Sequence, residues 1–174
     1  MKILLLIDSL DIGGAETHVE ILAIELKSMG HEVVIASGGG KIHDRLIKNG
    51  IKCICLPQIE PSKQTLKSWV LKPFPIQQYL RQKRAVSRLI TQLNPHIVHT
   101  HTRRTAFFAH KTCKKLKIPL IVTAHAKFSM NFPKKALSKW GDTTIAVSED
   151  IKNHLVQHRV AHEKIEIIPN GVQI

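Results

Sequence analysis

The sequence predicts an α/β fold in which a doubly wound, mostly parallel sheet lies between two layers of helices. Short apolar runs alternate with longer amphipathic stretches along the whole chain, which indicates alternating strands and helices. The apolar runs are continuous, as is typical of strands that are buried on both faces of a parallel sheet. Right-handed crossovers between such strands favour a Rossmann-like order, so we expect three layers, α/β/α.

The first unit is a strand, a glycine turn and a helix. Residues 3–7 are five apolar residues in a row, Gly13 and Gly14 follow, and residues 15–29 have helical spacing. Paired glycines before a helix leave backbone N–H groups free beside the positive end of the helix dipole. This arrangement is a generic site for a phosphate or carboxylate, although a tight turn without a ligand explains the same glycines equally well.

Later elements follow the same pattern, with proline and glycine marking their ends. Prolines interrupt residues 57–75, which predicts an irregular segment, and residues 126–133 predict a loop. Ser148 is a good N-cap for the helix that follows it. The other predicted strands lie at residues 31–36, 51–56, 97–100, 120–124, 144–147 and 165–168. A short helix is predicted to end at residues 49–50, and another is predicted near residues 66–71. The remaining predicted helices lie at residues 76–93, 104–116, 134–139 and 148–157.

Length and composition favour one globular domain. The chain has 174 residues, of which 43% are hydrophobic, and no apolar stretch approaches the roughly 20 residues of a membrane span. The apolar run at residues 3–7 is too short for the core of a signal peptide, so we expect a cytoplasmic location. The odd cysteine count and the C-x-C spacing favour small buried hydrophobic side chains over a disulfide or metal site at Cys53, Cys55 and Cys113.

Positive charge is concentrated in the middle of the chain. The formal net charge is +13, and residues 61–141 contain 17 Lys and Arg but no Asp or Glu. Such a field attracts an anionic partner such as lipid headgroups, nucleic acid or a phosphorylated substrate. A surface that serves only solubility normally mixes both signs of charge.

The carboxyl ends of the predicted strands are where ligands bind in such sheets. The residues that follow them are small side chains, imidazoles and cations, with no pair of carboxylates at metal-ligand spacing, so we expect no metal. The dinucleotide motif G-x-G-x-x-G, the P-loop motif and the acidic cluster of a phospho-receiver are all missing from the sequence. The residues at these strand ends are Asp8, Ser9, Gly13, Gly14, Ser37, Gly38, His99, His101, Arg103, Arg104, His125, Lys127, Ser129, Ser148 and Glu149.

Five motifs in a fixed order carry a resemblance to a known family. They are Gly-Gly-Ala-Glu at 13–16, His-Thr-His at 99–101, Thr-Ala-His at 123–125, Ala-Val-Ser at 146–148 and Ile-Pro-Asn-Gly-Val at 168–172. The chain resembles the N-terminal domain of retaining GT-B glycosyltransferases of the large group 1 (GT4) family, and the resemblance covers essentially all residues. Each motif is weak alone, whereas the ordered set is fairly specific.

The resemblance implies a function and a set of site residues. His125 would lie near the transferred sugar as the catalytic residue, with a solvated loop histidine as the alternative. Gly13 and Gly14 would approach the diphosphate of a nucleotide-sugar donor, and the cations would line the side of a lipid-linked or saccharide acceptor. Neither a cofactor nor a metal is implied. The implied substrate-binding residues are Gly13, Gly14, His101, Arg103, Arg104, Lys127 and Ser148.

The sequence departs from the family pattern at its end. By resemblance, residues 1–168 form the acceptor-side domain and residues 169–174 begin the hinge to a donor-binding domain. The E-x7-E motif of that second domain is missing, so we expect this chain alone to be inactive or nearly so. Transfer of a hexosyl unit with retention, to a cell-envelope glycolipid or polysaccharide precursor, is the activity that the resemblance implies for the whole enzyme.

The basic middle segment fits a peripheral contact with the inner face of the cytoplasmic membrane. Apolar side chains lie among cations at residues 62–88, as in an interfacial helix, although a core-packed helix with a wet face is an equal alternative. The expected contacts are Trp69, Lys72, Arg81, Lys83 and Arg84. We expect no nucleic acid, because the cations lack interleaved aromatic residues. A non-catalytic lipid-binding module and an inactive partner of a full-length enzyme remain alternatives.

Overall fold

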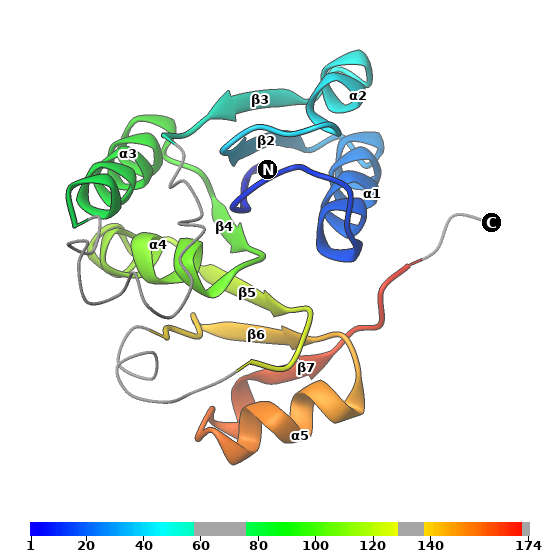
Figure 1. Cartoon of the computed structure of the whole chain (residues 1–174), viewed down its shortest axis with the longest axis vertical. Coiled ribbons are helices and arrows are strands. Elements are labelled where there is room, and N and C mark those ends of the chain that lie inside the picture. Colours follow the sequence, from blue (N-terminus) through cyan, green and yellow to red (C-terminus); the bar gives the residue numbers. More distant parts are fainter. Residues whose placement is uncertain (58–75, 129–137, 172–174) are drawn as a thin grey trace, which may run out of the picture.

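The computed structural model describes residues 1–57, 76–128 and 138–171, and in them the predicted fold is confirmed (Figure 1). All pairings in the seven-stranded sheet are parallel, in the order β3-β2-β1-β4-β5-β6-β7. The strands are β1 (Lys2–Leu6), β2 (Glu32–Ser37), β3 (Lys52–Cys55), β4 (Ile97–Thr100), β5 (Leu120–Ala124), β6 (Thr143–Ala146) and β7 (Ile165–Ile167). The helices are α1 (Gly14–Ser28), α2 (His43–Lys48), α3 (Ile76–Leu93), α4 (Arg103–Leu116), α5 (Glu149–Gln157) and the 3-10 turn η2 (His162–Lys164).

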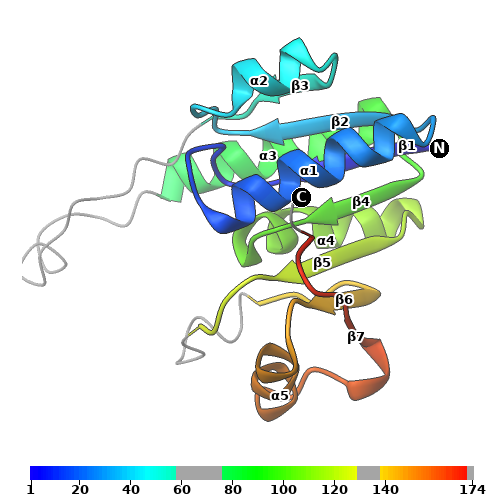
Figure 2. The same ribbon diagram turned by 90° about the vertical axis from the view of Figure 1, so that its right-hand side faces the viewer.

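The direction in which strands are added reverses once, between β1 and β4. The chain builds β1, β2 and β3 outward in one direction, then returns through α3 to place β4 on the free side of β1. Figure 2 shows the strands side by side from β3 at the top to β7 at the bottom. This order is that of a doubly wound Rossmann-like sheet, in which ligands bind where the strand order reverses.

The alternating side chains of β1 divide the core into two layers. Ile3 and Leu5 pack with α1 and α2, whereas Leu4 and Leu6 pack with α3 and α4 on the opposite face. Successive side chains of a strand point to opposite faces, so a continuous apolar run is what a strand between two helical layers requires. Figure 1 shows α1 and α2 on one side of the sheet and α3 and α4 on the other.

Most predicted elements are confirmed to within one or two residues, and those at 76–93, 97–100 and 120–124 match the observed bounds. The helix predicted near 66–71 lies outside the described residues. Of the helix predicted at 134–139, only Ser138 and Lys139 are described, and neither is helical. The prediction of buried cysteines holds for Cys113 but is wrong for Cys55, which is exposed because β3 is the edge strand of the sheet.

Candidate functional site

The site lies at the carboxyl ends of β1, β4 and β5, beside the point where strand order reverses. Leu6 at the end of β1 pairs with Thr100 at the end of β4, so the loops that follow these strands leave the same edge of the sheet. The first loop leads to the N-terminus of α1, and the second begins with His101. His125 directly follows β5, the neighbour of β4. Residues from three segments distant in sequence therefore meet at the place where doubly wound folds form their ligand crevice.

Glycine is not required at the N-terminus of α1 by backbone conformation. Gly13, the N-cap, has φ −173°, which is ordinary extended backbone, and a Cβ at Gly14 would meet nothing within 4 Å. A Cβ at Gly13 would meet only the side chain of Glu16. By contrast, Gly40 has φ +144°, and a Cβ there would clash with the Leu10 backbone. Gly40 is thus structural, whereas Gly14 leaves its position at the helix N-terminus open to close approach by an anion, and the Glu16 carboxylate lies beside Gly13.

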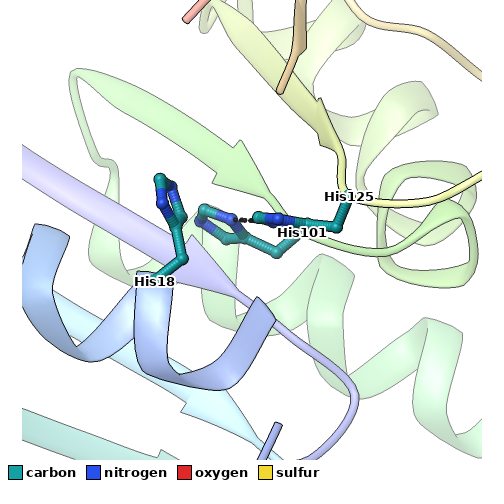
Figure 3. Close-up of side chains that lie close together, drawn as sticks. All are labelled: His18, His101 and His125. Atoms are coloured by element: carbon teal, nitrogen blue, oxygen red, sulfur yellow. Dashed lines mark hydrogen bonds between the residues drawn. The ribbon is translucent and has the colours of Figure 1, made fainter. Parts of the chain in front are cut away.

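Three histidines converge beside α1 (Figure 3). The Nδ1 atom of His101 and the Nε2 atom of His125 are 3.3 Å apart. The ring of His18, from the second turn of α1, lies 5.7 Å from that of His101 and 5.1 Å from that of His125, measured between centroids. The side chain of His101 is buried, with 3% exposure, whereas His18 and His125 are half-buried.

A fourth imidazole, that of His99, packs against the ring of His101. The His99 Nε2 atom lies 2.7 Å from the Oγ1 atom of Thr123 on the neighbouring strand, and the His99 ring lies 4.3 Å from that of His101. Two buried nitrogens, Nε2 of His101 and Nδ1 of His125, have no hydrogen-bond partner among the described residues. Buried polar atoms are nearly always paired, so two unpartnered nitrogens on neighbouring rings are suited to binding a ligand.

Burial keeps these imidazoles neutral. It lowers the pKa of His99 to about 3 and that of His125 to about 4, and repulsion from the charged form of His18 adds to both shifts. The pKa of His101 lies well below the usual value for the same reasons, and burial also lowers that of His18. A neutral imidazole offers one N–H donor and one lone pair, which suits hydrogen bonds to hydroxyl groups.

The predicted cations of the site are held by acids from outside the acid-free middle segment. Arg104 Nε donates to Asp8 Oδ1 over 3.0 Å, which joins the N-terminus of α4 to the loop after β1. Lys127 Nζ lies 2.7 Å from Asp150 Oδ1 in the first turn of α5. Both cations therefore take part in ion pairs within the domain. Their roles toward a substrate stay predictions.

Phe128 anchors the loop that carries His125. Its backbone N–H lies 3.2 Å from His154 Nε2 on α5, its ring stacks on Trp140, and the guanidinium of Arg103 lies 4.3 Å from its centroid. Ser148 uses its hydroxyl to cap α5, accepting the Ile151 N–H over 3.3 Å. The capping prediction is thus confirmed, and the hydroxyl has a structural role whatever it contributes to substrate binding.

The predicted membrane contacts that the structure describes lie on α3. Trp69 and Lys72 are outside the described residues. Arg81 and Arg84 are exposed on α3 and line a hollow of about 460 Å³, while Lys83 lies 5.2 Å from the centroid of the Phe107 ring. In the described parts of the chain, no helix is both long and apolar enough to cross a bilayer.

His18 is the site residue that the sequence analysis missed. That analysis considered only residues that follow strands, and it expected no metal because no carboxylates were suitably spaced. His18 lies instead inside α1, three residues after Ala15 and four before Leu22, both of which pack against the core. A histidine within the core-facing stripe of the first helix was the available signal.

Comparison with known proteins shows the family and the fold of the chain. The sequence profile of Glycosyltransferase Family 4 matches residues 12–174, so the chain belongs to that family. No protein of curated function matches the sequence. The fold is that of the N-terminal domain of GT-B glycosyltransferases, as three solved structures illustrate.

HepE from Anabaena, solved with UDP-glucose, is 16% identical with TM-score 0.73, over 99% of this chain and 44% of that one. A glycosyltransferase from Rickettsia africae is 24% identical with TM-score 0.68, over 98% and 43%. WaaB, a lipopolysaccharide outer core galactosyltransferase, is 18% identical with TM-score 0.71, over 100% and 47%. The chain thus spans less than half the length of each.

Alanine substitutions at Gly14 and Gly40 distinguish a glycine that leaves space for a ligand from a glycine that the backbone conformation requires. Gly14→Ala should change the free energy of unfolding by less than about 1 kcal/mol, because alanine fits the helix and meets no atoms. Gly40→Ala should destabilise the fold by several kcal/mol or prevent folding, because of positive φ and backbone overlap. Urea denaturation of both variants checks this, and a large loss with Gly14→Ala would show that this glycine is structural.

Acid should destabilise the domain through the histidine cluster. Between the unfolded imidazole pKa of about 6.5 and the lower folded pKa values, the unfolded chain binds more protons. The contribution of the neutral histidines to the free energy of unfolding is therefore fully present above pH 6.5. It decreases toward pH 4, by an amount on the order of a few kcal/mol.

Urea denaturation in EDTA between pH 7 and pH 4 measures this dependence. A matched variant, His99→Gln, keeps an amide near Thr123 but cannot titrate, so its stability should vary less steeply with pH. Stability that is constant or rises on acidification would contradict the buried neutral state.

Proposed function

We propose that this domain is the acceptor-binding half of a retaining glycosyltransferase that moves a hexosyl unit from a nucleotide-sugar. The observation that carries the proposal is the group of neutral histidines beside an open helix N-terminus, at the point where strand order reverses. Family membership supports the reaction class. Residues 1–168 form the domain in this proposal, and residues 169–174 begin the connection to a donor-binding domain.

The helix terminus suits the leaving group of such a reaction. Backbone N–H groups at Gly13 and Gly14, with the α1 dipole behind them, would bind the diphosphate as its negative charge increases during departure. The open space at Gly14 allows phosphate oxygens to come close to the backbone. HepE was solved with UDP-glucose, which supports the proposal that the enzyme containing this domain uses a donor with a nucleoside diphosphate.

His125 would act on the sugar rather than on the phosphates. A neutral imidazole at this place can hydrogen-bond a hydroxyl of the transferred sugar or of the acceptor and orient it for attack. Its Nδ1 atom, unpartnered and buried, is available for that bond. His101 would fix the ring of His125 through their 3.3 Å contact, and Arg103, Arg104 and Lys127 would face the acceptor.

The acceptor that we propose is a cell-envelope glycolipid or polysaccharide precursor at the cytoplasmic side of a membrane. WaaB acts on lipopolysaccharide, which supports acceptors of this class on the same fold. The exposed arginines of α3, beside the exposed side chain of Leu80, would contact anionic headgroups. The domain alone should turn over slowly or not at all, because the reaction needs both walls of the cleft.

Removal of the His125 imidazole tests the site. In a two-domain enzyme that carries this domain, His125→Ala should lower kcat by roughly 10²- to 10⁴-fold, the usual contribution of a positioned imidazole. His162→Ala, in η2 away from the crevice, is the matched control and should retain normal turnover. The measurement is steady-state turnover of nucleotide-sugar, and near-normal turnover by a folded His125→Ala enzyme would remove His125 from the mechanism.

Charge reversal on α3 tests the membrane contact. The triple change Arg81→Glu, Lys83→Glu and Arg84→Glu should weaken binding to vesicles of anionic phospholipid at least tenfold, since each cation contributes on the order of 1 kcal/mol. The control has the same charge change at Lys114, Lys115 and Lys117, around the end of α4. Vesicle sedimentation at two salt concentrations measures both, and equal losses would indicate a general charge effect rather than a surface on α3.

A further inference from the structure

We propose that His18, His101 and His125 form a binding site for a transition-metal cation such as Zn²⁺, and that an ion held there blocks the crevice. The trio shares His101 and His125 with the proposed active site, whose reaction as proposed uses no metal. Three imidazoles from three elements face one another: His18 from α1, His101 after β4 and His125 after β5 (Figure 3). One candidate ligand atom from each residue lies within 4.8 Å of those of the other two.

The separation of one pair already fits a shared ion. The Nδ1 atom of His101 and the Nε2 atom of His125 are 3.3 Å apart. Two nitrogens at about 2.0–2.1 Å from one tetrahedral zinc ion are roughly 3.3–3.4 Å from each other. An ion could therefore replace the hydrogen bond between these rings with little movement of either, and His18 must approach to complete the set.

The mobility of the three side chains suits this closure. His101 is packed against His99, which is itself fixed by Thr123, so this ring is the rigid member. His18 is half-buried on the second turn of α1, and in this proposal a rotation of its side chain would bring the ring closer to the other two. The site is thus preorganised at two ligands and adjustable at the third.

The ligand type selects the class of ion. Imidazole nitrogen suits Zn²⁺, Cu²⁺ and Ni²⁺, whereas Mg²⁺ and Ca²⁺ prefer oxygen ligands, which this trio does not offer. Three protein ligands leave a fourth position for water or an anion, as in many open zinc sites. The net charge of +13 opposes a cation, so we expect a micromolar rather than a nanomolar dissociation constant.

Binding of the ion would block the crevice. An ion bound to Nε2 of His125 would fix the ring whose Nδ1 atom is proposed to bond a sugar hydroxyl, and the ion itself would occupy the space between the three rings. The result would be reversible inhibition by the metal, which a chelator relieves. The inhibition by the ion rests on the proposed function, whereas the binding of the ion does not.

The test is a titration of the untagged 174-residue chain with Co²⁺, followed by displacement with Zn²⁺ in a calorimeter. We expect one ion per chain, with the intense visible absorption of four-coordinate cobalt. His18→Ala should weaken binding at least tenfold and remove that absorption. Because the side chain is only half-buried, the variant should fold, and His18→Gln provides a second variant if it does not. His162→Ala is the control and should bind normally.

A rival site decides the interpretation. The His43 Nε2 atom lies 3.9 Å from the Sγ atom of Cys55 at the sheet edge, so this pair could also take up metal. If His43→Ala abolishes cobalt binding and His18→Ala does not, the proposal is wrong. Weak visible absorption typical of six-coordinate Co²⁺ would also overturn the proposal. So would an affinity for Co²⁺ that is equal in the wild type and in both His18 variants.

The blocking effect is measured separately in a two-domain enzyme. Zn²⁺ should inhibit the wild-type enzyme, and EDTA should relieve this inhibition. The His18→Gln enzyme should need at least tenfold more Zn²⁺ for the same inhibition. If Zn²⁺ binds the isolated chain but does not inhibit, the site stands and the blocking is refuted. If the enzyme transfers no sugar at all, the proposed function fails while the cobalt titration still decides the metal site.

Discussion

The parallel pairing of β1 with β2 on one side and with β4 on the other is the constraint on which the site depends. Parallel strands end at one edge of the sheet, so the connections after β1 and β4 start side by side. The first must continue into α1 on one face and the second into α4 on the other, because their apolar stripes belong to different core layers. The connections therefore diverge and leave a crevice between the N-terminus of α1 and the histidines that follow β4 and β5.

The crevice holds polar groups that the fold itself does not satisfy. Burial of His101 and His125 costs free energy, and two of their nitrogens lack partners among the described residues. The contact between His99 and Thr123 joins two neighbouring strands of the sheet, whereas the rings of His18, His101 and His125 contact one another. An arrangement that weakens the fold but presents donors and acceptors to one space is typical of a binding site.

Local patterns were sufficient to predict the elements, but not the contacts among them. The strand at residues 120–124 and the helix at 76–93 were predicted with their observed bounds, because continuous apolar runs and a terminal Asn-Pro pair act within a few residues. The position of His125 followed from its place after a strand. The convergence of His18 on it depends on the rotation of α1 about its axis and on strand order. Both are tertiary properties, as is the exposure of Cys55 on an edge strand.

The same tertiary view resolves the uneven charge of the chain. Residues 61–141 contain no acid, yet Arg104 and Lys127 at the crevice are paired with Asp8 and Asp150, which lie before and after that segment. Among the ion pairs between described residues, none involves a cation of α3. The fold thus pairs Arg104 and Lys127 with acids and leaves the cations of α3 without an ion pair among the described residues. A positive field that is separated from the crevice can attract an anionic surface without competing for the charged groups of a substrate.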